Sequence, residues 1–128
     1  MKKIKELIKG VECVVMSTNN NQIILNIRFK IKPGKKETFR ESLFAMISNF
    51  KSEPAFVNAI VSDDLDHSDD LVIYEIWQGT RESWIQYELN KPYRAEYEGA
   101  LTNLIDDRIV SWLEPVGEWG STLTNVRR

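Results

Sequence analysis

Residues 22–32 read QIILNIRFKIK, and this stretch decides the fold. Apart from an extra isoleucine at position 24, every second side chain is hydrophobic: Ile23, Leu25, Ile27, Phe29 and Ile31. A period of two buries one face of a β-strand and leaves the other face polar. Pro33-Gly34 then ends the predicted strand, because proline cannot donate to a β-ladder and glycine permits a tight turn.

The period changes immediately after this turn. Residues 35–50 carry one helical stripe, formed by Phe39, Leu43, Met46, Ile47 and Phe50, and the sequence SEP at 52–54 stops the predicted helix. Residues 55–62 and 71–78 have the β-branched and aromatic content of strands. The polar, acidic segment 63–70 between them predicts a hairpin loop.

A second helical region and a last strand complete the pattern. Thr80 is a predicted N-cap, because its hydroxyl can accept a hydrogen bond from a free amide of the first turn. The helix over 81–89 is broken by Asn90-Lys91-Pro92 and resumes over 93–104, and 109–116 has strand character.

The order β-α-β-β-α-β predicts an α+β fold, the ferredoxin-like arrangement, with helices on one face of an antiparallel sheet. The strands carry too much Ile, Val, Trp and Tyr for the other face to be left to water. We therefore expect a homodimer whose second subunit covers that face. The domain spans 22–116, with an N-terminal extension over 1–21 and a C-terminal tail over 117–128.

Composition excludes several classes of protein. With 128 residues and a net charge of −2, the chain is one domain without a positive field for nucleic acid. No apolar run is long enough to span a membrane, and no secretory leader is evident, so we expect a cytoplasmic protein. The single Cys13 rules out a disulfide-built scaffold.

Four segments together resemble the antibiotic biosynthesis monooxygenase family of dimeric α+β barrels. They are the first strand with its KPGK turn at 32–35, SEPA at 52–55, YEIW at 74–77, which matches the family's Y-E-x-W, and KPY at 91–93, where the family usually has S-P-H. The resemblance covers residues 22–116. It implies a cofactor-independent monooxygenase, an oxidoreductase that oxygenates a small quinol or hydroxyaromatic compound without metal or flavin.

The chain departs from the family pattern at the residues that matter most. The two histidines of the family's H-x-x-S-P-H pattern align with Tyr87 and Tyr93. The Asn, Trp and His set of the haem-degrading branch aligns with Ile27, Gln86 and Glu96, which argues against that branch. A non-catalytic dimeric module that binds a small ligand is therefore the alternative function, and a purely structural dimer that contacts another protein is a third.

Oxygenating a quinol without a cofactor requires an apolar slot, a base for the phenolic proton and a donor for the reduced oxygen. The candidate catalytic residues are Tyr87, Tyr93 and Glu75. The candidate substrate-binding residues are Trp77, Trp84, Asn26, Arg28 and Tyr97. Tyrosine has an ordinary pKa of about 10, so a tyrosine base would need a nearby arginine to lower that pKa, and Glu75 could serve as the base if burial raises its own.

Each of these residues also has a structural interpretation. Aromatic residues at helical spacing are equally typical of a hydrophobic core. Glu75 could be a structural partner in an ion pair. Asn26 and Arg28 could be polar groups of a dimer interface on the outer face of the sheet. In the acidic loop 63–70 the required calcium-loop glycine is replaced by Asp69, so we expect a solvated hairpin and no metal site.

Overall fold

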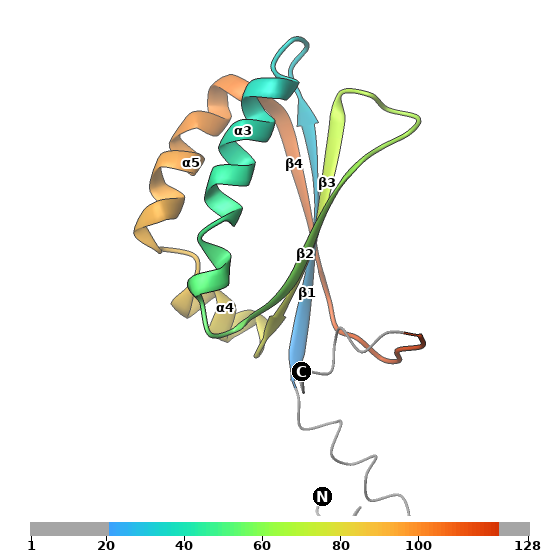
Figure 1. The fold of residues 1–128 in the computed structure, drawn as a ribbon, viewed down its shortest axis with the longest axis vertical. Helices are drawn as coiled ribbons and strands as arrows, with labels where there is room; N and C mark the ends of the chain where they lie inside the picture. Colours follow the sequence, from blue (N-terminus) through green and yellow to red (C-terminus); the bar gives the residue numbers. More distant parts are fainter. Residues whose placement is uncertain (1–20, 121–128) are drawn as a thin grey trace, which may run out of the picture.

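The structure, a computed structural model, describes residues 21–120 (Figure 1). The predicted N-terminal extension, except for its last residue, and residues 121–128 of the predicted tail lie outside the described part. The elements are β1 Gln22–Ile31, α3 Lys36–Ile47, the 3₁₀ helix η2 Phe50–Ser52, β2 Phe56–Asp63, β3 Asp70–Gln78, α4 Arg81–Tyr87, α5 Pro92–Leu104 and β4 Ile105–Leu113. This order confirms the predicted α+β, ferredoxin-like fold.

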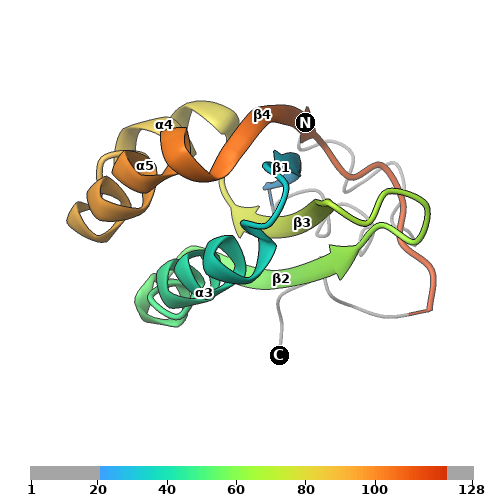
Figure 2. The same ribbon diagram turned by 90° about the horizontal axis from the view of Figure 1, so that it is seen from above.

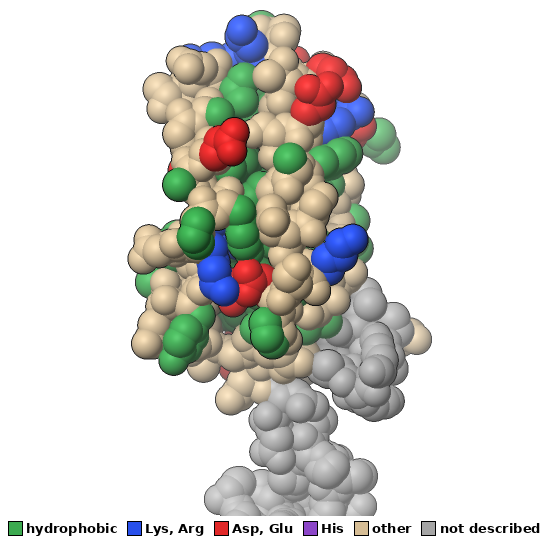
Figure 3. All heavy atoms as spheres, turned by 60° about the vertical axis from the view of Figure 1, so that its left-hand side comes forward, with side chains coloured by type: hydrophobic (Ala, Val, Ile, Leu, Met, Phe, Trp, Pro, Cys, Tyr) green, Lys and Arg blue, Asp and Glu red, His purple; other side chains and the backbone are tan. Residues whose placement is uncertain are grey.

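The four strands form one antiparallel sheet in the order β2-β3-β1-β4. Helices α3 and α5 lie against one face, and α4 lies at one end of that face (Figures 1 and 2). No helix among residues 21–120 is long and apolar enough to cross a membrane. On the helix side, charged side chains of both signs are interspersed with hydrophobic ones (Figure 3).

The strand register decides which side chains face the helices. In the β1–β3 ladder, Ile23 pairs with Trp77, Leu25 with Glu75 and Ile27 with Ile73. Paired residues project to the same side of a sheet, so Glu75 joins the hydrophobic row that faces the helices. The core between the layers includes Phe29, Phe39, Leu43, Phe50 and Trp77.

The chain from 79 to 104 forms two helices, as the sequence predicts. The Thr80 hydroxyl accepts a hydrogen bond from the Ser83 amide at 3.1 Å, and the Ser83 hydroxyl accepts one from the Thr80 amide at 2.9 Å. This reciprocal capping box satisfies two amides at the start of α4. Pro92 occupies the first turn of α5, where its missing N–H costs nothing.

The last strand begins earlier than its sequence pattern predicts. β4 starts at Ile105, directly after α5, and not at 109. Asp106 and Asp107 conceal the strand in the sequence, because both are polar and side-by-side acidic residues are uncommon in strands. Pairing with β1 overrides that preference, since Asp107 lies opposite Lys30 at the edge of the sheet.

Candidate functional site

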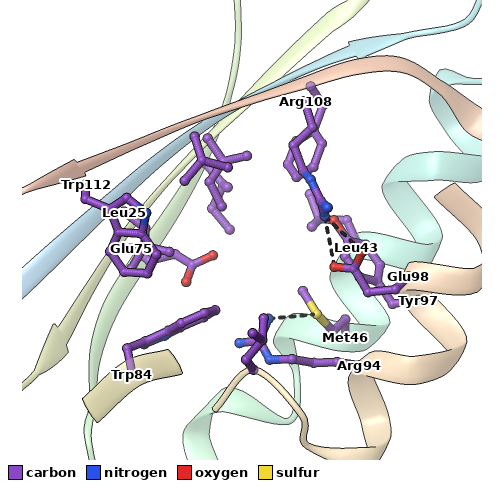
Figure 4. Close-up of a pocket in the computed structure, with 15 residues that line it drawn as sticks. Leu25, Leu43, Met46, Glu75, Trp84, Arg94, Tyr97, Glu98, Arg108 and Trp112 are labelled. Carbon is purple, nitrogen blue, oxygen red and sulfur yellow. Dashed lines mark hydrogen bonds and ion pairs between the residues drawn. The ribbon is translucent and has the colours of Figure 1, made fainter. Parts of the chain in front are cut away.

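A cavity of about 220 Å³ lies between the sheet and the helices α4 and α5 (Figure 4). Its apolar walls come from the strands, from α3 and from α4, and include Leu25, Ile27, Leu43, Met46 and Trp84. Four charged side chains line this space: Glu98 and Arg108 pair with each other, whereas Glu75 and Arg94 enter from opposite layers. Glu75 comes from β3 and Arg94 from α5, and both point into the cavity.

Glu75 is a buried carboxyl group, with only 3% of the residue exposed. Its Oε1 atom accepts a hydrogen bond from the indole Nε1 of Trp77 at 2.8 Å. Burial raises the pKa of Glu75 above its ordinary value, while the Trp77 hydrogen bond and the charge of Arg94 act in the opposite direction. A carboxyl group with a raised pKa is a stronger base once it is ionised, which suits it to accept a proton from a bound hydroxyl group.

Arg94 is buried as deeply, with 6% of the residue exposed, but it has no carboxylate partner within salt-bridge distance among the described residues. Its Cζ atom lies 4.8 Å from the Trp84 ring centroid and 5.2 Å from that of Phe50, and Nη1 contacts the Met46 sulfur at 3.8 Å. The Nε and Nη2 atoms have no hydrogen-bond partner. Unsatisfied buried guanidinium atoms are costly, so Arg94 is a candidate for binding an anion.

Aromatic rings surround the Glu75 and Arg94 side chains. The Trp84 ring packs edge-on against Trp77, with centroids 6.2 Å apart, and against Trp112, with centroids 5.5 Å apart. Tyr97 closes the far wall. Near it, Arg108 of β4 forms an ion pair with Glu98 of α5 at 2.9 Å, which joins the sheet to the helix layer.

The structure brings only some of the predicted site residues together. Glu75, Trp84 and Tyr97 line the cavity, and Trp77 lies fully buried behind Glu75. Burial raises the pKa of Tyr97 above its ordinary value, so its hydroxyl keeps its proton at neutral pH.

The two tyrosines that replace the family's histidines do not line this cavity. Tyr87 is 62% exposed on the outside of α4. The Tyr93 hydroxyl donates a hydrogen bond to Glu53 at 3.0 Å, beside an ion pair between Lys91 and Glu53 at 2.8 Å. Burial and the bond to Glu53 both raise the pKa of Tyr93, so this phenol keeps its proton at neutral pH.

Asn26 and Arg28 lie on the outer face of the sheet, away from the cavity. Asn26 pairs with Tyr74 and Arg28 with Val72, all on the side opposite Leu25 and Glu75. Arg28 forms ion pairs with Asp64 at 2.9 Å and with Asp70 at 2.7 Å. It thereby holds the acidic hairpin loop against the sheet.

The sequence interpretation missed Arg94 and Arg108. Arg94 carries a detectable signal, because positions 94, 97, 101 and 104 share one helical face and the other three residues on it are apolar or aromatic. A lone arginine on such a stripe must be buried or displaced. Arg108 carries no comparable signal, since the start of β4 is concealed in the sequence.

Across residues 21–120, no group of three or more histidine, cysteine, aspartate or glutamate side chains is placed to hold a metal ion. The loop 63–70 uses its carboxylates internally. Asp64 accepts hydrogen bonds from the backbone amides of Asp66 and His67 and pairs with Arg28. These bonds hold the pKa of Asp64 well below its ordinary value.

Solved structures with the same architecture are numerous, although their sequences have diverged. Rv0793 from Mycobacterium tuberculosis superimposes with a TM-score of 0.69 at 20% identity, covering 77% of this chain and 99% of the other. SO0527 from Shewanella oneidensis superimposes with a TM-score of 0.68 at 17% identity, covering 76% of this chain and 93% of the other. SnoaB, a cofactor-independent oxygenase from Streptomyces nogalater, superimposes with a TM-score of 0.67 at 17% identity, covering 79% of this chain and 99% of the other. At such identities the likeness establishes the fold alone.

The sequence comparisons reach further. No curated protein matches the chain. The family model for antibiotic biosynthesis monooxygenase matches residues 22–96, which is more than half of the chain and includes β1 through the first turns of α5. The chain therefore belongs to the antibiotic biosynthesis monooxygenase family.

Proposed function

We propose that the protein is a cofactor-independent monooxygenase that acts on a small quinol or hydroxyaromatic compound in the cavity under the sheet. The observation that carries this proposal is the arrangement of Glu75 and Arg94. A buried carboxyl group and a buried guanidinium face the same apolar space, and no ion pair joins them. A phenolic hydroxyl bound between them would have a proton acceptor on one side and an anion-stabilising group on the other.

The chemistry divides between these two residues. Glu75 removes the phenolic proton, and its raised pKa makes it a better base than an exposed glutamate. Arg94 stabilises the resulting phenolate and then the reduced oxygen species. The electrons come from the substrate: one oxygen atom of O₂ is added to the ring and the other leaves as water.

The aromatic walls supply the remaining requirement, which is an apolar slot for a planar ring. Trp84, Tyr97 and Trp112 present ring surfaces to the cavity. An engineered apolar cavity of about 150 Å³ binds benzene, so a volume of about 220 Å³ suits one substituted ring. Exclusion of water also strengthens the electrostatic effect of Arg94.

Oxygen consumption with a panel of hydroquinones, without added metal or flavin, tests the proposal. Glu75→Gln should lower the rate by about 10²–10⁴-fold, the usual contribution of a general base. Glu82→Gln, on the exposed side of α4, is the matched control and should keep the full rate. Tyr87→Phe should also keep it, because Tyr87 lies outside the cavity. Oxygen uptake that is equal in the Glu75→Gln and unmodified proteins would reject Glu75 as the base.

A non-catalytic module that binds a small aromatic ligand is the second candidate function. The observation in its favour is that the aligned positions of the family's two histidines are an exposed Tyr87 and a Tyr93 bound to Glu53. Thermal stabilisation by a hydroxyaromatic ligand, without consumption of the ligand or of oxygen, would support this function over the first.

For either function we infer a homodimer formed through the outer face of the sheet. Ile60, Tyr74, Ile109 and Leu113 lie on that face and are exposed. An exposed row of large hydrophobic side chains on a strand surface is typical of a protein interface. Family members, which are typically homodimers, provide the precedent.

A further inference from the structure

A second hollow of about 290 Å³ lies on the other side of Trp84 from the cavity. Its lining includes Pro54 and Ala55 before β2, Ser83 and Tyr87 of α4, and Lys91. Of all the described residues, Trp84 alone lines both spaces. Trp84 therefore borders both the cavity of the proposed function and this outer chamber.

Trp84 belongs to the hydrophobic core and is held there by ring and cation–π contacts. It is the one buried residue of α4, at 7% exposed. Its neighbours are aromatic rings and the Arg94 guanidinium, and its indole Nε1 has no hydrogen-bond partner among residues 21–120. Removing the indole would therefore break van der Waals and cation–π contacts but would leave no polar group newly unpaired.

The chambers on either side have compatible chemistry. Pro54, Ala55 and Tyr87 give the outer chamber an apolar wall, and its polar lining consists of Gln78, Ser83, Glu88 and the ion pair between Lys91 and Glu53. A hydroxyaromatic ring seated between Glu75 and Arg94 would point further fused rings toward one of the cavity walls. Where that wall is Trp84, the space behind it could hold an apolar extension of the substrate.

We propose that Trp84 is a partition that sets the size of the ring system the site accepts: a single ring when the indole is present, and fused rings when it is removed. The identity of the ligand as a hydroxyaromatic compound rests on the proposed function. The partition itself rests on the two chambers and on the side chain they share.

Anaerobic binding measurements separate this proposal from catalysis. The dissociation constants of phenol, 2-naphthol and 2-hydroxyanthracene are measured by equilibrium dialysis against the full-length protein and against Trp84→Ala, Trp84→Leu and Trp84→Phe. The matched control is Trp119→Ala, which removes an exposed indole that lines none of these chambers. Thermal unfolding of each variant identifies those that remain folded. If Trp84→Ala does not fold, Trp84→Leu takes its place, because leucine retains most of the apolar volume.

In the unmodified protein and in Trp119→Ala, phenol should bind and the fused-ring compounds should gain nothing from their extra rings. In folded Trp84→Ala or Trp84→Leu, 2-naphthol and 2-hydroxyanthracene should bind at least about tenfold more tightly relative to phenol, because each added ring then leaves water for an apolar wall. Trp84→Phe should lie between these limits.

An unchanged preference in a folded Trp84 variant would overturn the partition, as would tight binding of 2-hydroxyanthracene by the unmodified protein. The proposed function fails separately. Expanded binding without oxygen uptake in air would leave the partition standing and reject oxygenation. Oxygen uptake with single-ring quinols, together with an unchanged size preference in the Trp84 variants, would support oxygenation and reject the partition.

Discussion

Glu75 and Arg94 are unusual residues because each buries a charged group without a partner of opposite charge in hydrogen-bond contact. Burying an ionisable group costs free energy unless pairing compensates for it. Buried ionisable groups that line a cavity are candidates for a functional site. Both residues should therefore show their cost in stability measurements.

The pH dependence of stability should report the burial of Glu75. Its pKa is raised in the folded state and ordinary, at 4.5, in the unfolded chain. Above pH 4.5 the folded protein therefore binds more protons than the unfolded chain, and the free energy of unfolding falls as the pH rises, by up to about 1.4 kcal/mol per pH unit.

Urea unfolding of the unmodified protein and of Glu75→Gln between pH 4 and 7 measures this effect. The variant should lose that part of the slope, so that its stability relative to the unmodified protein increases with pH. Glu88 also has a pKa raised by burial, and its contribution cancels in this comparison. Parallel curves for the two proteins would show that Glu75 is not buried as described.

Arg94→Met should leave stability unchanged or raise it while abolishing activity. Methionine fills a similar volume among Trp84, Phe50 and Met46 and removes the unsatisfied guanidinium atoms. Replacing a buried charge with a hydrophobic residue is often neutral or stabilising by about 1–4 kcal/mol. Urea unfolding and oxygen uptake are the measurements, with the partly exposed Arg40→Met as the control. A large loss of stability would mean that Arg94 is a structural residue.

At the scale of elements, α4 is the least anchored helix around the cavity. It has seven residues, one of them buried, and depends on its capping box and on the turn at Gly79 for its position. The sequence predicts this helix and its Thr80 N-cap, since capping signals are local. Its boundaries matter because it carries Trp84.

Two glycine substitutions should move stability in opposite directions. Gly79 has φ +110°, and an added Cβ would collide with the Ser83 hydroxyl of the capping box. Gly79→Ala should therefore destabilise the protein by more than about 1 kcal/mol.

Gly99 lies within α5 with open space around it, so Gly99→Ala should stabilise by about 0.5–1 kcal/mol through helix propensity. Urea unfolding tests both, and equal effects of the two changes would contradict the assigned backbone.

At the scale of the whole molecule, the sheet has helices on one face only. In the inferred dimer, the second subunit would cover the other face, as the hydrophobic strands of the sequence predict. The solved structures with TM-scores near 0.7 align over about three quarters of the chain, so they share its overall fold.

A charge placed on the outer sheet face should separate the subunits. Ile60→Arg would bury an unpaired guanidinium in the interface, which typically costs several kcal/mol. Light scattering after size exclusion should give the mass of a dimer for the unmodified protein and of one chain for the variant. Phe44→Arg, which changes an equally exposed side chain on α3, should stay dimeric. A single-chain mass for the unmodified protein would reject the inferred dimer.

The sequence by itself determined the order of elements, the antiparallel α+β class and the break between α4 and α5. These features follow from periodicity, capping and proline, which act over a few residues. It could not delimit β4, where Asp106 and Asp107 mask a strand that pairing with β1 enforces.

Only the tertiary structure decided which candidate residues share a site. Register placed Glu75 among the core-facing residues and sent Asn26 and Arg28 to the outer face, because a shift of one position exchanges the two faces of a strand. Packing from α3, α4 and α5 buried Arg94 against Trp84, whereas Tyr93 turned to Glu53, 40 positions away in the sequence. The partners of these side chains come from distant elements, so no local pattern encodes them.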